Sequence, residues 1–120
     1  MSSISSNLIP PYSSALKAND HLYVSGQLPL NENGEIDSNV VAQTNQCLTN
    51  MRTVLNLNGF NMRDVVKTTV FMTDFSEFDD MNNEYTKFFD QPYPARSAVQ
   101  VGALAKGAKL EIDCIAVKRK

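Results

Sequence analysis

The order of apolar and polar positions divides the first half of the chain into a strand, a turn and a helix. Residues 21–28 alternate between apolar and polar side chains, which is typical of a half-buried strand. Asn33-Gly34 follows as a hairpin turn signal, so we expect a second strand to pair after it. Over residues 40–58 apolar side chains recur every three to four positions and predict an amphipathic helix, with Gly59 as the residue that ends it.

The middle of the chain adds a strand and a second helix. Residues 64–73 are rich in β-branched side chains and predict a strand. Apolar positions occur on both of its faces, with Val66, Val70 and Met72 on one and Val65 and Phe71 on the other. Residues 74–90 predict a helix, because Asp74 and Glu77 resemble a capping box and apolar residues follow at helical spacing.

The last two predicted strands carry the charges of greatest interest, Arg96 and Glu111. In the strand over residues 110–117, one face carries Leu110, Ile112, Cys114 and Ala116, and the other carries Glu111, Asp113, Ile115 and Val117. Two helices can cover only one face of such a sheet, so the half-apolar second face is expected to need another subunit. The pattern therefore predicts an α+β fold with both helices packed on one face.

Composition narrows the class of protein. The chain has 120 residues, enough for one domain (1–120), in which we expect residues 1–11 with Pro10-Pro11 to form a flexible N-terminal arm. A content of 42% hydrophobic and 20% charged residues is typical of a soluble protein, and the net charge of -2 makes a nucleic-acid partner unlikely. No membrane span or signal peptide is recognisable, so we expect a cytoplasmic protein without a membrane partner.

Few residues suit metal or thiol chemistry. Cys47, Cys114 and His21 are too few for an ordinary zinc site, and both thiols are interpreted as small buried hydrophobes. No metal and no cofactor is expected. Arg96 offers a planar fork of donors that matches a carboxylate, and Glu111 can take a proton or hold a water, so the pair suits a small anionic substrate that reacts with water. On residue types alone, a structural Arg–Glu ion pair is the more common explanation.

A set of short motifs in a fixed order bears on the choice between a substrate site and a structural ion pair. They are Tyr12-Ser-Ser-Ala, Tyr23-Val-Ser-Gly-Gln, Gln43-Thr-x-Gln, Asp64-Val-Val-Lys-Thr-Thr-Val-Phe-Met-Thr-Asp, Asn82-x-x-Tyr-x-x-Phe-Phe, Pro94-Ala-Arg-Ser and Leu110-Glu-Ile. Together they resemble the Rid family of reactive-intermediate deaminases, also called YjgF-like or L-PSP proteins, from Tyr12 to Val117. The resemblance implies a chorismate-mutase-like α+β fold assembled as a homotrimer, with active sites in clefts between subunits.

The resemblance also implies roles for individual residues. The matching Arg96 binds the substrate carboxylate, and the matching Glu111 orients or activates water. Further residues line the pocket, namely Tyr12, Ser25, Gly26, Asn82 and Ala98. At Ala98 many deaminase members have Cys, so the backbone there would have to serve in its place. The implied reaction is hydrolysis of a 2-imino or enamino acid, such as 2-iminobutanoate or 2-iminopropanoate, to the 2-keto acid and ammonia. The alternatives are an L-PSP-type endoribonuclease or translation inhibitor, and a regulatory trimer that binds small carboxylates without turnover.

Overall fold

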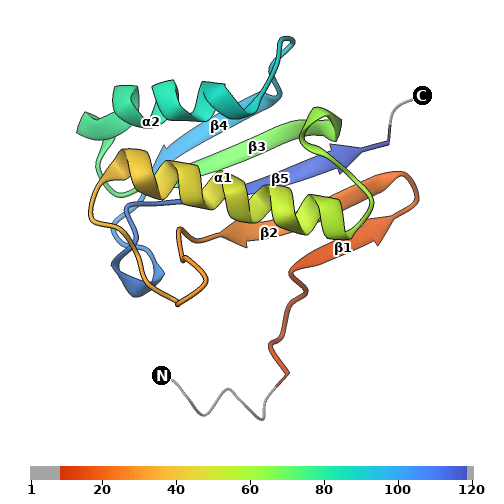
Figure 1. Cartoon of the computed structure of the whole chain (residues 1–120), viewed down its shortest axis with the longest axis horizontal. Helices are drawn as coiled ribbons and strands as arrows, with labels where there is room; N and C mark the ends of the chain where they lie inside the picture. The colour runs from red at the N-terminus through yellow and green to blue at the C-terminus, as the bar shows by residue number, and fades with distance from the viewer. Residues whose placement is uncertain (1–8, 119–120) are drawn as a thin grey trace.

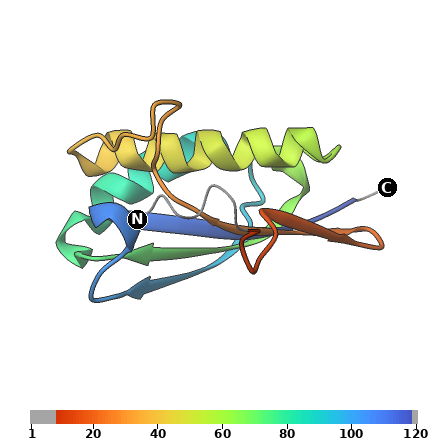
Figure 2. The ribbon, with the colours of Figure 1, turned by 90° about the horizontal axis from the view of Figure 1, so that it is seen from below.

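The computed structural model describes residues 9–118 as two layers, a five-stranded sheet and two helices that cover one of its faces (Figures 1 and 2). The strands are β1 (Ala15–Ala18), β2 (His21–Gln27), β3 (Val65–Met72), β4 (Ala95–Gln100) and β5 (Leu110–Val117), and the helices are α1 (Val40–Leu57) and α2 (Phe78–Tyr85). Across the sheet the order is β1-β2-β5-β3-β4, and only β3 and β4 run parallel to each other. The predicted α+β class, with both helices on one face, is confirmed.

Helix α1 forms where the apolar spacing predicts it. The side chain of Asn39 caps the helix by accepting a hydrogen bond from the backbone N–H of Ala42 at 2.8 Å. Gly59 adopts a φ of 82° just beyond the C-cap, a left-handed conformation that favours glycine. The apolar stripe of α1, centred on Leu48 and Met51, is fully buried against the sheet. The predicted helix and its end at Gly59 are therefore confirmed.

The hairpin at the start of the sheet differs from the prediction. β1 pairs with β2 through a two-residue turn at Asn19-Asp20, where Asn19 has a φ of 54°. Asn33-Gly34 does form a turn, since the backbone N–H of Gly34 donates to Asn31 at 2.9 Å, but it closes only an isolated bridge between Leu30 and Ile36. The prediction of a second strand after that turn was therefore wrong. β1 is a mostly exposed edge strand without β-branched residues, so the apolar pattern did not reveal it.

β3 contains a bulge that moves its apolar positions between faces. The register with β5 shifts between Val65 and Lys67, so Val65 faces the helices together with Val70 and Met72. Val65 is 4% exposed, whereas Val66 is only half-buried. The prediction that placed Val66 with Val70 and Met72 was therefore wrong, because strict alternation fails where one strand has an extra residue.

Helix α2 is shorter than predicted. Only Phe78–Tyr85 is α-helical, and the 3-10 turns η3 (Phe75–Glu77) and η4 (Thr86–Phe88) flank it. The side chain of Asp74 caps η3 by accepting from the backbone of Ser76, but Glu77 pairs with Lys109 at 3.2 Å instead of completing a capping box. Residues 74–90 are therefore a broken helix, and the chain returns from it to β4 through an extended loop.

The two faces of the sheet have different environments. Along β5 the side chains alternate as predicted, with Leu110, Ile112, Cys114 and Ala116 buried beneath the helices. No helix covers the opposite face (Figure 2), which we call the open face. By register it carries Leu16, Tyr23, Lys67, Thr69, Phe71, Ser97, Val99, Glu111, Asp113 and Ile115. Leu16 and Tyr23 are 61% and 45% exposed on this face. The homotrimer expected to cover it stays a prediction.

The predicted N-terminal arm lies only partly within the described residues. Of the arm predicted over residues 1–11, residues 1–8 lie outside the described part of the chain, and Ile9–Pro11 are exposed and belong to no helix or strand.

Neither α1 nor α2 has the length and apolar character needed to cross a membrane, and no other span was found within residues 9–118.

Candidate functional site

Arg96 lies near the start of β4 and turns its side chain toward α2. In the parallel register it stands beside Thr68, which is fully buried on the face that the helices cover. Its Nη1 donates a hydrogen bond to Oδ1 of Asn82 at 2.7 Å. The guanidinium carbon lies 5.4 Å from the ring centre of Phe78 and 4.8 Å from that of Tyr85, within the range of cation–π contacts. Arg96 and Asn82 are thus brought together, as expected of two residues in one site.

Tyr85 links this arginine to the core. Its hydroxyl forms a hydrogen bond of 2.7 Å with the hydroxyl of Thr68, and its ring centre lies 4.8 Å from that of Phe89. Burial raises the pKa of the Tyr85 hydroxyl, while the hydrogen bond to Thr68 and the charge of Arg96 act against that rise. The ring therefore stays neutral over the physiological range and presents a fixed aromatic surface to the guanidinium.

Glu111 lies on the open face, beside the bulge in β2. The register between β2 and β5 shifts between Val24 and Gln27, and Gly26 falls inside that irregularity. A Cβ added to Gly26 would overlap Oε2 of Glu111 and lie 2.7 Å from its Cδ. Only glycine leaves room there for the carboxylate. Gly26 thus lies at a bulge in β2 and at a close approach of the Glu111 side chain to the backbone.

The carboxyl group of Glu111 has an altered acidity. Partial burial raises its pKa, and the neighbouring charge of Asp113 raises it further. Within residues 9–118, no hydrogen bond or ion pair to the Glu111 carboxylate occurs, so nothing in the described chain offsets that rise. A half-buried carboxylate with a raised pKa accepts a proton more readily than an ordinary surface glutamate, as a general base must.

Tyr12 and Ser25 lie on the same face as Glu111. The Ser25 hydroxyl donates to the backbone carbonyl of Ser13 at 2.6 Å, which ties the segment before β1 to β2. Tyr12 is 69% exposed. With Tyr23, Lys67 and Asp113 among others, both residues line an open pocket of about 460 Å³. Gly26 and Glu111 are not part of this lining, although Glu111 lies on the same face and Gly26 directly follows Ser25 in β2.

Ala98 and the two cysteines contribute no reactive side chain. Ala98 is partly buried and packs against the core on the side of the sheet that carries Arg96. Cys47 donates its thiol hydrogen to the carbonyl of Gln27 at 3.3 Å. Burial, with a smaller effect of Asp113, raises the pKa of Cys114 to about 12, and burial also raises that of Cys47. Both thiols are buried and free, which confirms their interpretation as small hydrophobes.

The predicted site residues thus form two groups on opposite faces of one sheet. Arg96, Asn82 and Ala98 lie on the helix side of the β4 edge, whereas Glu111 and its neighbours lie on the open face. No ion pair joins Arg96 to Glu111 within residues 9–118, so the alternative of a structural pair inside one chain was wrong. Because the two side chains lie on opposite faces of the sheet, one chain alone does not place both of them around one substrate.

Three residues of the Arg96 environment were not predicted as site residues, namely Thr68, Phe78 and Tyr85. A signal for two of them was present in the sequence. Phe78, Asn82 and Tyr85 stand at positions i, i+4 and i+7, and therefore on one face of a helix. Once Asn82 was assigned to the pocket, its helical neighbours were the next candidates. Thr68 gave no signal of its own, since its role depends on the pairing of β3 with β4.

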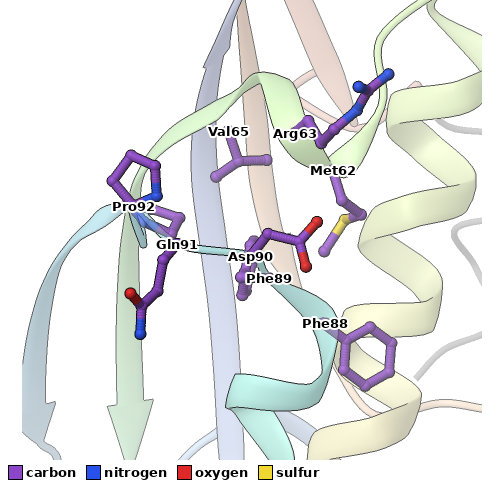
Figure 3. A pocket seen from close by; sticks show the side chains of 9 residues that line it. Met62, Arg63, Val65, Phe88, Phe89, Asp90, Gln91 and Pro92 are labelled. Atoms are coloured by element: carbon purple, nitrogen blue, oxygen red, sulfur yellow. The ribbon is translucent and has the colours of Figure 1, made fainter.

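A separate pocket of about 330 Å³ contains none of the predicted site residues. It lies between the turn before β3 and the loop after α2, and its lining includes Met62, Phe88 and Asp90 (Figure 3). Its lining contains one basic residue, Arg63, together with the carboxylate of Asp90. Within residues 9–118, no group of three or more His, Cys, Asp or Glu is placed to hold a metal ion.

Comparison with known proteins gives a consistent result. The family model described as "Endoribonuclease L-PSP" matches residues 4–118. The chain is 48% identical over 109 residues to "RutC family protein y4sK" of Sinorhizobium fredii, covering 89% of this chain and 86% of that protein. It is 39% identical over 115 residues to the 2-iminobutanoate/2-iminopropanoate deaminase of Escherichia coli, covering 92% and 90%.

A solved structure supports the same relationship. The structure of E. coli TdcF with bound serine superposes with a TM-score of 0.87 at 38% identity, covering 92% of this chain and 91% of that one. The range matched by the family model includes β4, β5 and α2, the elements that carry Arg96, Glu111 and Asn82. The chain therefore belongs to the Endoribonuclease L-PSP family, the Rid family that its motifs resemble.

Proposed function

We propose that the protein hydrolyses 2-imino acids, or the enamines in equilibrium with them, to 2-keto acids and ammonia. The observation that carries this proposal is the carboxylate of Glu111, which has a raised pKa and no partner within residues 9–118. A group in that state can take a proton from water and return it to a leaving group. The name of the E. coli relative supports 2-iminobutanoate and 2-iminopropanoate as the substrates to test first.

The placement of Arg96 supports a site shared between two copies of the chain. Arg96 and Glu111 lie on opposite faces of the sheet, so a single substrate can contact both only where the helix side of one copy meets the open face of another. The exposed Leu16 and Tyr23 make contact between copies favourable on that face. We infer a cyclic homotrimer of roughly 40 kDa with one site at each contact between subunits.

The proposed reaction uses the two groups in sequence. Arg96 holds the substrate carboxylate by charge-assisted hydrogen bonds and thereby sets the position of C2. Glu111 takes a proton from a water as the water oxygen bonds to C2, the C=N electron pair moves to nitrogen, and the nitrogen takes a proton from solvent to give a carbinolamine. Glu111 then returns its proton to the amine nitrogen, the C–N bond breaks with its electron pair leaving on ammonia, and the hydroxyl proton passes to solvent to give the keto acid. Tyr12, Ser25, Gly26, Asn82 and Ala98 complete the proposed pocket.

Beyond the description of the family model, no observation favours the endoribonuclease alternative. The net charge is -2, which gives no general attraction to a polyanion. A receptor for carboxylates without turnover is also disfavoured, because a second carboxylate such as Glu111 would weaken the binding of an anionic ligand. The substrate, the trimer and a cytoplasmic location stay predictions.

A coupled assay tests the proposal directly. A pyridoxal-phosphate-dependent dehydratase acting on threonine or serine generates the imine in place, and ammonia release is timed with and without the protein. We expect faster release with the protein. Release at the spontaneous rate would overturn the proposal. Light scattering in the same buffer checks the trimer, and a stable monomer would contradict the shared site.

A further inference from the structure

The guanidinium of Arg96 lies against two aromatic rings supplied by a single helix. Phe78 and Tyr85 stand seven positions apart on α2, and their ring centres lie 5.4 Å and 4.8 Å from the guanidinium carbon. Asn82, between them in the sequence, accepts the hydrogen bond from Nη1 at 2.7 Å. One helical face thus holds Arg96 through two ring contacts and one hydrogen bond.

The core fixes the position of one of these rings. Tyr85 is 3% exposed and Thr68 is fully buried, and their hydroxyls are joined by a hydrogen bond of 2.7 Å. Thr68 is also the register partner of Arg96 across β3 and β4. β3, the strand next to Arg96 in the sheet, therefore also anchors the Tyr85 ring that the Arg96 guanidinium contacts. The ring and the arginine thus keep fixed positions relative to each other.

We propose that Phe78 and Tyr85 are positioning residues that hold the Arg96 guanidinium ready for the substrate carboxylate before the substrate binds. The inference rests on the proposed function, in which Arg96 binds the carboxylate of a 2-imino acid. An arginine side chain loses considerable rotamer freedom when it is fixed, and a group that is fixed in advance does not incur that loss on binding. The hydrogen bond to Asn82 uses one N–H of Nη1 and leaves the other guanidinium donors for the carboxylate.

The chain contains a matched control for this arrangement. Phe88 also packs partly buried against the core, and its ring centre lies 5.3 Å from the guanidinium carbon of Arg52. Phe78 is likewise partly buried against the core. Phe78→Leu and Phe88→Leu therefore make the same change in chemistry and in cation–π contact, but only the first alters the environment of Arg96.

Binding of 2-ketobutyrate, the stable keto-acid product of 2-iminobutanoate hydrolysis, tests the proposal by calorimetry. We expect Phe78→Leu to raise the Kd about three- to tenfold, and kcat/KM in the coupled assay to fall by a similar factor. Tyr85→Phe keeps the ring and loses only its hydroxyl anchor, so it should have a smaller effect in the same direction. Phe88→Leu should leave both quantities unchanged. Equal effects of Phe78→Leu and Phe88→Leu would overturn the proposal, because they would indicate general loss of packing.

Chemical rescue separates positioning from folding. In Arg96→Ala, free guanidinium ion can occupy the space between the rings and restore part of the activity. If the rings position that group, rescue in the double variant with Phe78→Leu should need several-fold more guanidinium, whereas the double variant with Phe88→Leu should match Arg96→Ala. Identical concentration dependence in all three proteins, or no rescue in any of them, would overturn the proposal.

The outcomes for the function and for the positioning role can be told apart. If the unsubstituted protein releases no ammonia above the spontaneous rate but binds 2-ketobutyrate, the proposed function is overturned, and the Kd values of Phe78→Leu and Phe88→Leu still decide the positioning role. If the protein is active and Phe78→Leu changes neither Kd nor kcat/KM, the function stands and the positioning role is overturned. If 2-ketobutyrate does not bind to the unsubstituted protein, the positioning role is overturned as well.

Discussion

Arg96 lies beneath α2 with a hydrogen-bond acceptor and two aromatic rings around its guanidinium, whereas Glu111 lies on the open face with no partner in residues 9–118. The Arg96 guanidinium is held by contacts within residues 9–118, whereas the Glu111 carboxylate is not. At Arg96 the hydrogen bond to Asn82 and the two rings fix the position of the guanidinium. At Glu111 partial burial and the charge of Asp113 disfavour the ionised form.

This difference matches the different tasks of binding and reaction. A binding group works best when it is already in place, because less freedom is lost when the ligand arrives. A group that exchanges protons works best when neither protonation state is strongly favoured near the working pH. The raised pKa of the unpartnered Glu111 carboxylate is a change toward the second requirement, and a guanidinium held by aromatic rings meets the first.

The largest expected effect separates the two regions by chemistry. Glu111→Gln keeps the shape of the side chain but cannot take a proton, so imine hydrolysis should fall by about 10² to 10⁴. Binding of 2-ketobutyrate should hold or become tighter, because repulsion between two carboxylates is lost. Arg96→Lys should instead weaken binding and activity together, because an ammonium lacks the planar fork. The coupled assay and calorimetry measure both quantities, and full activity of Glu111→Gln would remove Glu111 from the mechanism.

The second prediction concerns whether the two regions meet across a subunit boundary. Arg96→Lys and Glu111→Gln are each expected to be nearly inactive when purified alone. If each site takes Arg96 from one copy and Glu111 from the next, random co-assembly of the two variants at equal amounts should restore about one quarter of the sites. Activity should rise only after the subunits are unfolded together and refolded. A mixture that stays as inactive as its components would contradict the shared site.

The third prediction concerns the space that holds the carboxylate. Gly26→Ala adds a Cβ that would overlap Oε2 of Glu111, so the carboxylate must move away. A displaced catalytic group of this kind should lower activity by about ten- to a hundredfold while the trimer persists. Gly102→Ala is the control, because nothing lies within 4 Å of a Cβ there and its backbone is outside the left-handed region. Comparable losses in both variants would mean that the bulge is not specific to Glu111.

Much of this fold could be predicted from side-chain spacing, and the exceptions have physical causes. α1 and β5 were predicted well because each has one face that is continuously buried, so the sequence repeats the period of the element. β1 is a short edge strand with little burial, and the β3 bulge shifts its register, so neither follows a period. Spacing failed where the chain departs from regular geometry.

For the site, the motifs identified the residues but not their arrangement. Arg96 and Glu111 are fifteen positions apart in neighbouring predicted strands, and nothing in that spacing shows that their side chains leave opposite faces of the sheet. The reason is topological, since β4 pairs in parallel with β3 and never contacts β5 as a neighbour. The ring contacts of Arg96 likewise depend on how α2 lies over β4, which is a tertiary property.

The smallest expected effect concerns stability as a function of pH, and it contrasts Glu111 with the buried carboxylate of Glu84. Hydrogen bonds from Asn45 and then from Lys87 lower the pKa of Glu84. Its contribution to stability is therefore present above the ordinary glutamate pKa of about 4.3 and is lost as the pH falls through its lower folded value. Glu84→Gln should cost about 1 kcal/mol at neutral pH, through the weaker hydrogen bonds of a neutral amide.

Glu111 should show the opposite sign, because its folded pKa is raised. Below the ordinary glutamate pKa its carboxyl is protonated in both states and has no effect on stability. As the pH rises from there through the folded pKa, the folded state holds its proton longer than the unfolded state, so stability decreases until the pH exceeds both values. Glu111→Gln should therefore gain stability relative to the unsubstituted protein as the pH rises above the ordinary glutamate pKa, whereas Glu84→Gln should lose it as the pH rises toward that pKa from below. Urea unfolding across both pH ranges measures the two differences, and parallel curves for the two variants would contradict the assignment of Glu111 as a carboxylate that the fold leaves unpaired.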